Sequence, residues 1–185
     1  MMRISGGEVK GRTLRFPSHC TQRPTTDFLR EALFNLLEQP VDQHFLDLFA
    51  GSGSVGLEAL SRKAQSVTFV EKNKILIDVI RENVSRCGYS EKCLLVQADV
   101  QSALRDLYKK KCRYDVVFAD PPYHQGLIEE TLAALKKYPV LRDGGAVVMQ
   151  HSVREPLPEL EAGWFVTDQR KYGDNYLSFI RMDKA

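Results

Sequence analysis

The chain has 185 residues, of which 43% are hydrophobic and 27% charged, and its formal net charge is +2. These values are typical of one soluble globular domain, and no apolar run approaches the roughly 18 residues of a membrane span. The N-terminus lacks the apolar core of a signal peptide, so a cytoplasmic location is expected. The four cysteines form no CxxC pair and the four histidines are scattered, which disfavours a metal site.

Residues 1–40 are predicted to form a basic N-terminal region packed on a main domain of residues 41–185. Residues 2–16 interleave short runs with glycines, which predicts a β-ribbon that carries arginines on one side. A helix then begins at Thr26 or Asp27 and ends before Pro40. Residues 1–30 contain six basic and two acidic residues, a net charge of +4. This region is a candidate phosphate contact, although a merely solvated surface would have the same composition.

From residue 45 onward, segments of strand length alternate with helical segments. Strands are expected at 45–49, 67–70, 93–96, 114–119 and 146–149, with helices near 55–62, 75–87, 102–110 and 127–137. Two further strands, 164–167 and 176–180, are joined without a helix, and so short a connection requires an antiparallel pair. The predicted fold class is α/β, with a Rossmann-like, mostly parallel sheet and a C-terminal antiparallel hairpin. This layout resembles that of class I S-adenosylmethionine-dependent methyltransferases.

Three features at the ends of successive strands predict a cofactor site. In the run from Asp47 to Gly56, Gly51 and Gly53 allow a sharp turn and a close approach to a ligand. Glu71 follows the second strand, where its carboxylate can bind ribose hydroxyls, and Asp99 follows the third, where it can accept from an adenine amino group. Ligands of such sheets bind outside the carboxyl ends of the strands, so these residues form one candidate site.

The glycine spacing alone does not identify the cofactor. A G-x-G-x-x-G string with an acid twenty residues after its first glycine is also what a nicotinamide-dinucleotide site predicts. Asp47 favours S-adenosylmethionine, because a carboxylate at the strand tip repels a pyrophosphate and attracts the ammonium group of a methionine moiety. S-adenosylhomocysteine is then the product, and no metal is required. The expected cofactor-binding residues are Asp47, Phe49, Gly51, Gly53, Glu71, Lys72, Asp99 and Val100.

The candidate catalytic residues are Asp120, Pro121, Pro122 and Tyr123, which directly follow the strand at 114–119. The acid and the Pro121 carbonyl can accept hydrogen bonds from an exocyclic NH2 group, and the prolines stiffen the segment. Tyr123 can stack on a base, a contact worth roughly 1–3 kcal/mol. An amino group conjugated with a base is a weak nucleophile, so its positioning supplies much of the rate. The segment predicts an amino-methyltransferase, and a rigid turn after a strand is the alternative.

With these residues in place, the chain resembles the RsmD family of bacterial 16S ribosomal RNA methyltransferases over nearly its full length. The stretches that carry the resemblance are Arg3-Ile4, Gly6, Gly11-Arg12, residues 23–27, 30–35, 47–53, 56–62, 69–71, 120–123 and 171–174. The box at 120–123 marks amino-methyltransferases in general, whereas its combination with Arg23-Pro24-Thr25-Thr26-Asp27 is far more specific. Two residues depart from the family pattern: Phe28 stands where a basic residue is usual, and Lys63 where glycine is usual.

The resemblance implies methylation of the N2 amino group of one guanine in 16S RNA, within the assembling or assembled small ribosomal subunit. It also implies a monomer whose basic ribbon helps to hold RNA. The RNA-binding residues implied are Arg3, Lys10, Arg12, Arg15, Arg23, Lys171 and Tyr172. A DNA adenine or cytosine amino-methyltransferase, a nicotinamide-dependent oxidoreductase and a non-catalytic RNA-binding module are the alternatives.

Overall fold

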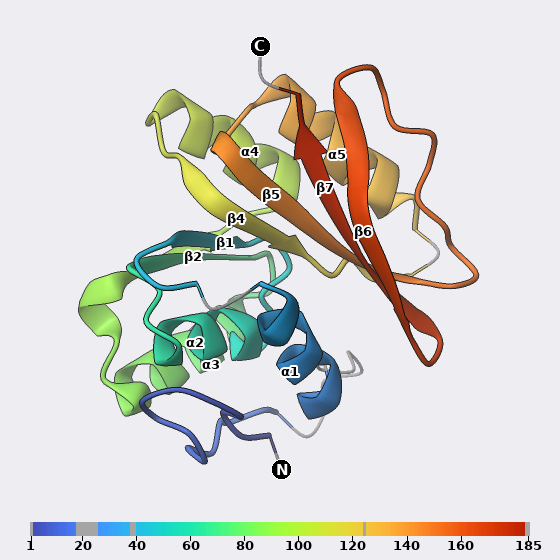
Figure 1. The fold of residues 1–185 in the computed structure, drawn as a ribbon. Helices are drawn as coiled ribbons and strands as arrows, with labels where there is room; N and C mark the ends of the chain where they lie inside the picture. The colour runs from blue at the N-terminus through green and yellow to red at the C-terminus, as the bar shows by residue number, and fades with distance from the viewer. Residues whose placement is uncertain (1, 18–25, 38–39, 124, 184–185) are drawn as a thin grey trace. The chain divides into compact units, whose positions relative to one another are not determined.

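The computed structural model describes residues 2–17, 26–37, 40–123 and 125–183. The chain divides after Asp99 into two units, residues 1–99 and 100–185 (Figure 1). The residues of the N-terminal region that the structure describes belong to the first unit. A boundary at residue 40 therefore stays a prediction. Within the described residues, no helix combines the length and the apolar character needed to cross a membrane.

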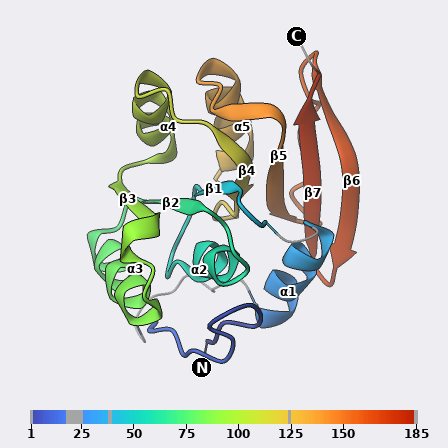
Figure 2. The same cartoon turned by 60° about the vertical axis from the view of Figure 1, so that its left-hand side comes forward.

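The first unit has a three-stranded parallel sheet of β1 (His44–Asp47), β2 (Ser66–Glu71) and β3 (Cys93–Gln97), in the order β3-β2-β1. Helix α2 (Ser54–Ser61) connects β1 to β2, and α3 (Lys74–Cys87) with the short helix η1 (Ser90–Lys92) connects β2 to β3. Both long helices lie on the same side of these strands (Figure 2). The strand and helix order confirms the alternation predicted from the sequence.

Residues 2–16 form a short antiparallel ribbon, as the sequence predicted, with two arms that pair around Arg3 and Thr13. The only bridge of strand type among the described residues of this segment joins Arg3 to Thr13, with Ile4 N donating to Arg12 O at 3.0 Å. Gly7 lies in the turn between the two arms. It has φ +77°, and a Cβ at this position would lie 1.9 Å from the Ser61 carbonyl oxygen. Glu8 N donates to the same oxygen at 2.7 Å, so the turn is held against the end of α2.

Helix α1 (Asp27–Leu36) begins at the N-cap Thr26, whose Oγ1 accepts a hydrogen bond from Leu29 N at 3.2 Å. It lies beside α2, and residues 2–14 run along the side of α2 that faces away from the strands (Figure 2). As a result, every residue of α2 is buried. A helix enclosed on all sides needs internal partners for its polar side chains.

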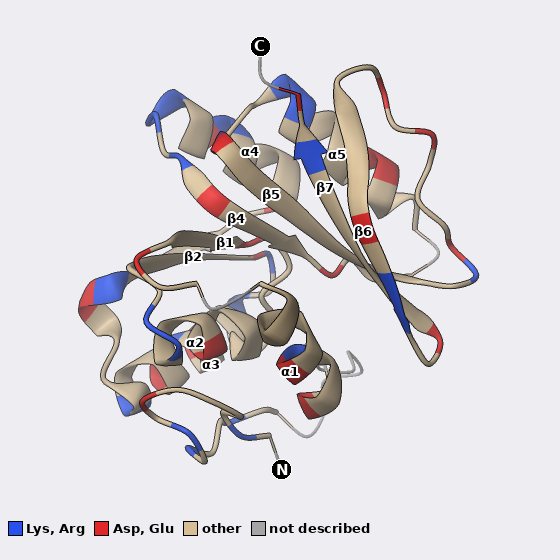
Figure 3. Cartoon of the chain, viewed as in Figure 1, with Lys and Arg blue, Asp and Glu red and all other residues tan. Residues whose placement is uncertain are grey.

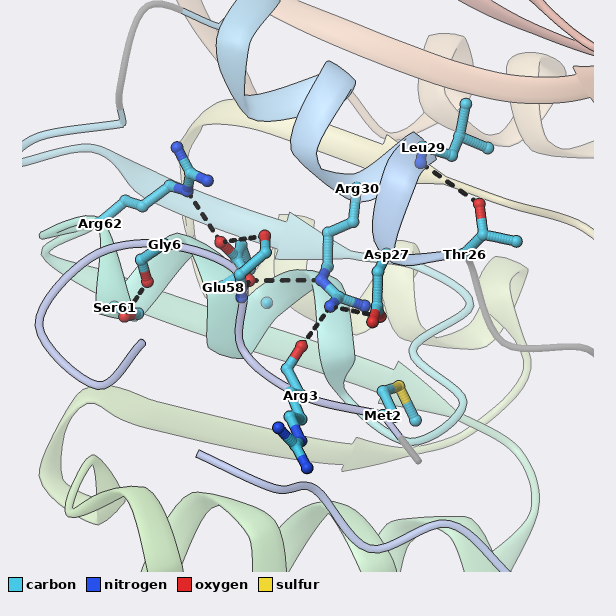
Figure 4. A network of polar contacts seen from close by, with 12 residues as sticks. Met2, Arg3, Gly6, Thr26, Asp27, Leu29, Arg30, Glu58, Ser61 and Arg62 are labelled. Carbon is cyan, nitrogen blue, oxygen red and sulfur yellow. Dashed lines mark hydrogen bonds and ion pairs between the residues drawn. The ribbon is translucent and has the colours of Figure 1, made fainter. Parts of the chain in front are cut away.

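The partners of Glu58 on α2 come from three separate segments (Figure 4). Its carboxylate accepts from the fully buried Arg30 (Nε, 3.3 Å) and from Arg62 (Nε, 2.9 Å). It also accepts from the backbone and the hydroxyl of Ser5, each at 2.8 Å. Arg30 in turn donates to Asp27 at 2.8 Å and to the Arg3 carbonyl oxygen. This network ties the N-terminal segment and α1 to α2.

The second unit contains β4 (Tyr114–Ala119), β5 (Leu141–Ser152), β6 (Trp164–Tyr172) and β7 (Asn175–Met182), in the order β4-β5-β7-β6. β4 and β5 are parallel, and the other two pairs are antiparallel. Helices α4 (Val100–Lys109) and α5 (Leu127–Lys137) pack against each other. Gly173 has φ +60° in the two-residue turn between β6 and β7, which a type II′ hairpin needs at that position. The predicted C-terminal hairpin is confirmed, with strands longer than expected.

Replacing Glu58 with glutamine removes the charge that balances Arg30 and Arg62. Because Arg30 has no access to water, we expect Glu58→Gln to lower the free energy of unfolding by about 3 kcal/mol, as when a buried ion pair is broken. The measurement is urea unfolding followed by circular dichroism. The control is Glu82→Gln, which breaks the exposed pair with Arg15 and should cost less than about 1 kcal/mol. Equal losses in the two variants would contradict this role of Glu58.

Candidate functional site: a glycine loop and an Asp-Pro-Pro-Tyr segment

One candidate site, in the first unit, is the loop between β1 and α2. Asp47, the last residue of β1, is buried, and its Oδ2 accepts a hydrogen bond from Gly56 N at 3.3 Å. Glu71, the last residue of β2, accepts from Gly51 N at 3.0 Å and from Asn73 N at 2.8 Å. The structure thus brings two carboxylates and the glycine loop to one end of the parallel strands, as the sequence predicted.

The glycines of this loop have different physical roles. Gly51 has φ +55°, and a Cβ there would meet no atom within 4 Å, so the backbone faces open space. Gly53 has φ +80° and is the N-cap of α2, which begins without a side-chain cap. A Cβ on Gly56 would lie 2.3 Å from the Phe69 ring, so this third glycine allows α2 to pack on β2. A Cβ on Gly53 would lie 3.3 Å from Ile80, so of these three glycines only Gly51 has open space beside it.

The remaining residues predicted to bind the cofactor differ in exposure. Phe49 is half-buried in the loop, whereas Lys72 is exposed directly after β2. Asp99 is exposed two residues beyond β3, whose last residue pairs in register with Glu71. Val100 is half-buried and is the first residue of α4, in the second unit. Their contact with a cofactor stays a prediction.

The open backbone at Gly51 and the carboxylates of Asp47 and Glu71 fit an S-adenosyl group. The loop offers space on the side where a Cβ is missing. A buried carboxylate at a strand tip suits an ammonium group, and a carboxylate already fixed by two backbone N–H groups can accept further hydrogen bonds from ribose hydroxyls. Among the described residues, no group of three or more His, Cys, Asp or Glu side chains is placed to hold a metal ion.

A second candidate site, in the second unit, is the segment that follows β4. Asp120 is half-buried, Pro121 is buried and Pro122 is half-buried. Tyr123 is 41% exposed, and its hydroxyl donates to Asn175 Oδ1 at 2.5 Å. Burial, the nearby charge of Asp120 and that of Glu155 together raise the pKa of the Tyr123 hydroxyl, although a hydrogen bond with Gln150 opposes them. The hydroxyl therefore remains a proton donor at neutral pH, and the ring is held by its polar end.

Asn175 was not expected from the sequence. It is the first residue of β7 and directly follows the turn after Lys171 and Tyr172, two of the predicted RNA contacts. Its partner Tyr123 lies 52 residues earlier. A local sequence pattern cannot predict this hydrogen bond, because the pairing of distant strands brings Tyr123 and Asn175 together. The turn between β6 and β7 and the Asp-Pro-Pro-Tyr segment thus form one cluster within the second unit.

The described basic residues of the N-terminal segment are coloured blue in Figure 3. Those of residues 2–16 are exposed, and two of them have partners on α3. Arg12 Nη1 donates to the Arg86 carbonyl oxygen at 2.9 Å, and Arg15 forms an ion pair with Glu82. Arg3 and Lys10 are exposed as well, and Arg23 lies outside the described residues. Both contacts of Arg12 and Arg15 are on the surface, where such interactions contribute little to stability.

Comparison of the structure with solved structures identifies the class of protein. The structure titled "Putative methyltransferase yhhF from Escherichia coli" matches with a TM-score of 0.87 and 32% identity, covering 100% of this chain and 99% of that chain. The fold is that of the class I S-adenosylmethionine-dependent methyltransferases, as the sequence predicted.

The sequence comparisons identify the family. Residues 2–181 match the family model described as "Conserved hypothetical protein 95", and the chain belongs to this RsmD-like family. "Ribosomal RNA small subunit methyltransferase D" of Escherichia coli is 36% identical over 173 residues, which cover 93% of this chain and 85% of the relative. "Putative rRNA methyltransferase YlbH" of Bacillus subtilis is 32% identical over 173 residues, covering 93% of this chain and 94% of the relative.

Gly51→Ala tests whether the open side of the loop receives the cofactor. The new methyl group would occupy that space, so we expect S-adenosylhomocysteine binding to weaken by about tenfold or more, equivalent to about 1.4 kcal/mol. The measurement is isothermal titration calorimetry. Gly88→Ala is the matched control, because Gly88 also has positive φ and open space at its Cβ position but ends α3. Both variants carry a similar strain of about 1–2 kcal/mol. Equal affinities in the two variants would contradict the assignment.

Proposed function

We propose that this protein transfers a methyl group from S-adenosylmethionine to the exocyclic N2 of a guanine in the 16S RNA of the small ribosomal subunit. The observation that carries the proposal is the Asp120–Tyr123 segment. It combines a half-buried acid, two prolines and a tyrosine whose hydroxyl is hydrogen-bonded to Asn175. The small-subunit RNA named for the Escherichia coli relative supports the substrate class.

In this proposal, the loop between β1 and α2 holds the methyl donor. Asp47 attracts the ammonium group of the methionine moiety, and Glu71 accepts from the ribose hydroxyls while fixing Gly51 through its backbone N–H. Asp99 accepts from the adenine amino group. When bound, S-adenosylmethionine supplies a methyl group that its sulfonium charge already activates. The protein therefore needs no residue that forms a covalent intermediate.

The segment after β4 holds the target base. Asp120 and the Pro121 carbonyl accept hydrogen bonds from the two N–H groups of the guanine amino group, which leaves the nitrogen lone pair available for the methyl group. The transfer leaves S-adenosylhomocysteine, and the methylated nitrogen releases its extra proton. The tyrosine ring stacks on the base, a contact that offsets part of the few kcal/mol needed to extrude it. The hydrogen bond from Tyr123 to Asn175 restricts the ring before the base arrives, so less entropy is lost on binding.

The decisive experiment supplies tritiated S-adenosylmethionine together with unmodified small subunits, naked 16S RNA or DNA, and then identifies the labelled nucleoside. We expect N2-methylguanosine. Asp120→Ala should lower the rate about 100-fold or more, as expected when a positioning contact at the reacting atom is lost. The same variant should still bind S-adenosylhomocysteine.

Asp115→Ala is the matched control for this experiment. Asp115 lies on the same strand, β4, and pairs with Arg142 at 3.0 Å. The control removes one carboxylate of the second unit without touching the Asp-Pro-Pro-Tyr segment, so methyl transfer should persist. Label on adenine or on DNA, or an undiminished rate in Asp120→Ala, would refute the proposed function.

The exposed arginines of residues 2–16 are proposed to contact RNA phosphates. Replacing Arg12 and Arg15 with alanine should weaken binding to 16S RNA and reduce the slope of log K against log salt by between about 1 and 2, because two phosphate contacts are lost. The measurement is filter binding between 50 and 200 mM salt. Replacing Arg105 and Lys109 of α4 removes the same charge elsewhere and is the control. An unchanged slope in the first variant would show that the segment does not contact phosphate.

A further inference from the structure

Asn83 of α3 is fully buried, and its amide bonds to two different segments of the first unit. Its Oδ1 accepts from the backbone N–H of Arg15 at 2.7 Å. Its Nδ2 donates to the Arg15 carbonyl oxygen at 2.9 Å and to the Ser52 carbonyl oxygen at 3.1 Å. Ser52 stands between Gly51 and Gly53. A single side chain therefore connects the basic N-terminal segment to the middle of the glycine loop.

Other contacts also fix the N-terminal segment and the glycine loop. The Ser52 hydroxyl donates to Met2 Sδ at 3.6 Å, and Glu71 holds the Gly51 N–H on the β2 side of the loop. Arg15 bonds to Asn83 through its backbone, while its side chain is 60% exposed and pairs with Glu82 on the surface. Arg15 can therefore contact a phosphate through its side chain, while its backbone is bound to Asn83, the residue that also holds the loop.

We propose that Asn83 is a positioning residue that couples the N-terminal segment to the cofactor loop. This inference rests on the proposed function, in which the loop binds S-adenosylmethionine and the segment contacts RNA. Both N–H groups of Asn83 are used inside the protein, so displacing either carbonyl leaves a buried donor without a partner. A ligand that fixes the loop therefore also fixes Arg15, and a phosphate that fixes Arg15 also fixes the loop. Such coupling is reciprocal, so each ligand raises the affinity for the other by the same factor.

The first test uses S-adenosylhomocysteine alone and needs no RNA. In the wild-type protein, hydrogen–deuterium exchange of a peptide covering residues 8–16 should slow by about fivefold or more when S-adenosylhomocysteine is bound, the lower end of usual coupling factors. Exchange in a peptide covering residues 164–172 of β6 should not change. Calorimetry on the same sample reports whether S-adenosylhomocysteine binds at all.

Asn83→Asp keeps the size of the side chain but points a carboxylate oxygen at the two carbonyl groups. In this variant, the protection of residues 8–16 should be lost. Ser85→Asp places the same new charge on an exposed position of α3 and should behave as the wild type. If Asn83→Asp does not fold, the wild-type exchange measurement decides the question by itself.

The second test compares affinities for S-adenosylhomocysteine with and without unmodified small subunits. We expect the subunits to tighten binding by about fivefold or more in the wild type, and the ratio to fall to about one in Asn83→Asp. A merely structural role of Asn83 would lower both affinities and leave their ratio unchanged, which would overturn the proposal.

The two possible failures are distinguishable. Binding of S-adenosylhomocysteine without any change in exchange at residues 8–16 would overturn the coupling and leave the cofactor assignment intact. Absence of S-adenosylhomocysteine binding would overturn the proposed function, and the coupling with it.

Discussion

The carboxylate of Glu58 is the constraint on which the first unit depends. It lies on a helix that is buried along its whole length, so its charge has to be balanced inside the protein. Two arginines and the hydroxyl and backbone of Ser5 provide that balance, and each comes from a different segment. Because α2 starts at the glycine loop, the partners of Glu58 also hold the helix from which the loop departs. The geometry of the glycine loop therefore depends on how the N-terminal region packs on α2.

In the second unit, the main constraint is the position of the Tyr123 ring. Two prolines stiffen the chain that precedes Tyr123, and Asn175 holds the ring at its far end. Asn175 begins β7 directly after a two-residue turn, so its own position is determined by the strand pairing of the hairpin. The antiparallel strands at the end of the chain thus support the residues after β4, which are proposed to hold the target base.

Much of this arrangement could be predicted from the sequence, because it depends on local patterns. Apolar runs located the strands, and Asp47 and Glu71 were expected at strand ends, where the structure has them. The ribbon predicted for residues 2–16 is present as a short antiparallel pairing, with a single bridge between Arg3 and Thr13. Asn83, Asn175 and Arg30 could not be assigned roles, since their partners lie 68, 52 and 28 residues away. Such contacts depend on helix packing and strand register, which cannot be predicted from the residues adjacent in the sequence.

The bond between Arg15 and Asn83 has a consequence for biosynthesis. Arg15 leaves the ribosome well before its partner 68 positions later has been made. Until α3 has emerged, neither the backbone N–H nor the carbonyl of Arg15 can form its bond to Asn83. This part of the basic segment is therefore fixed later than it is translated.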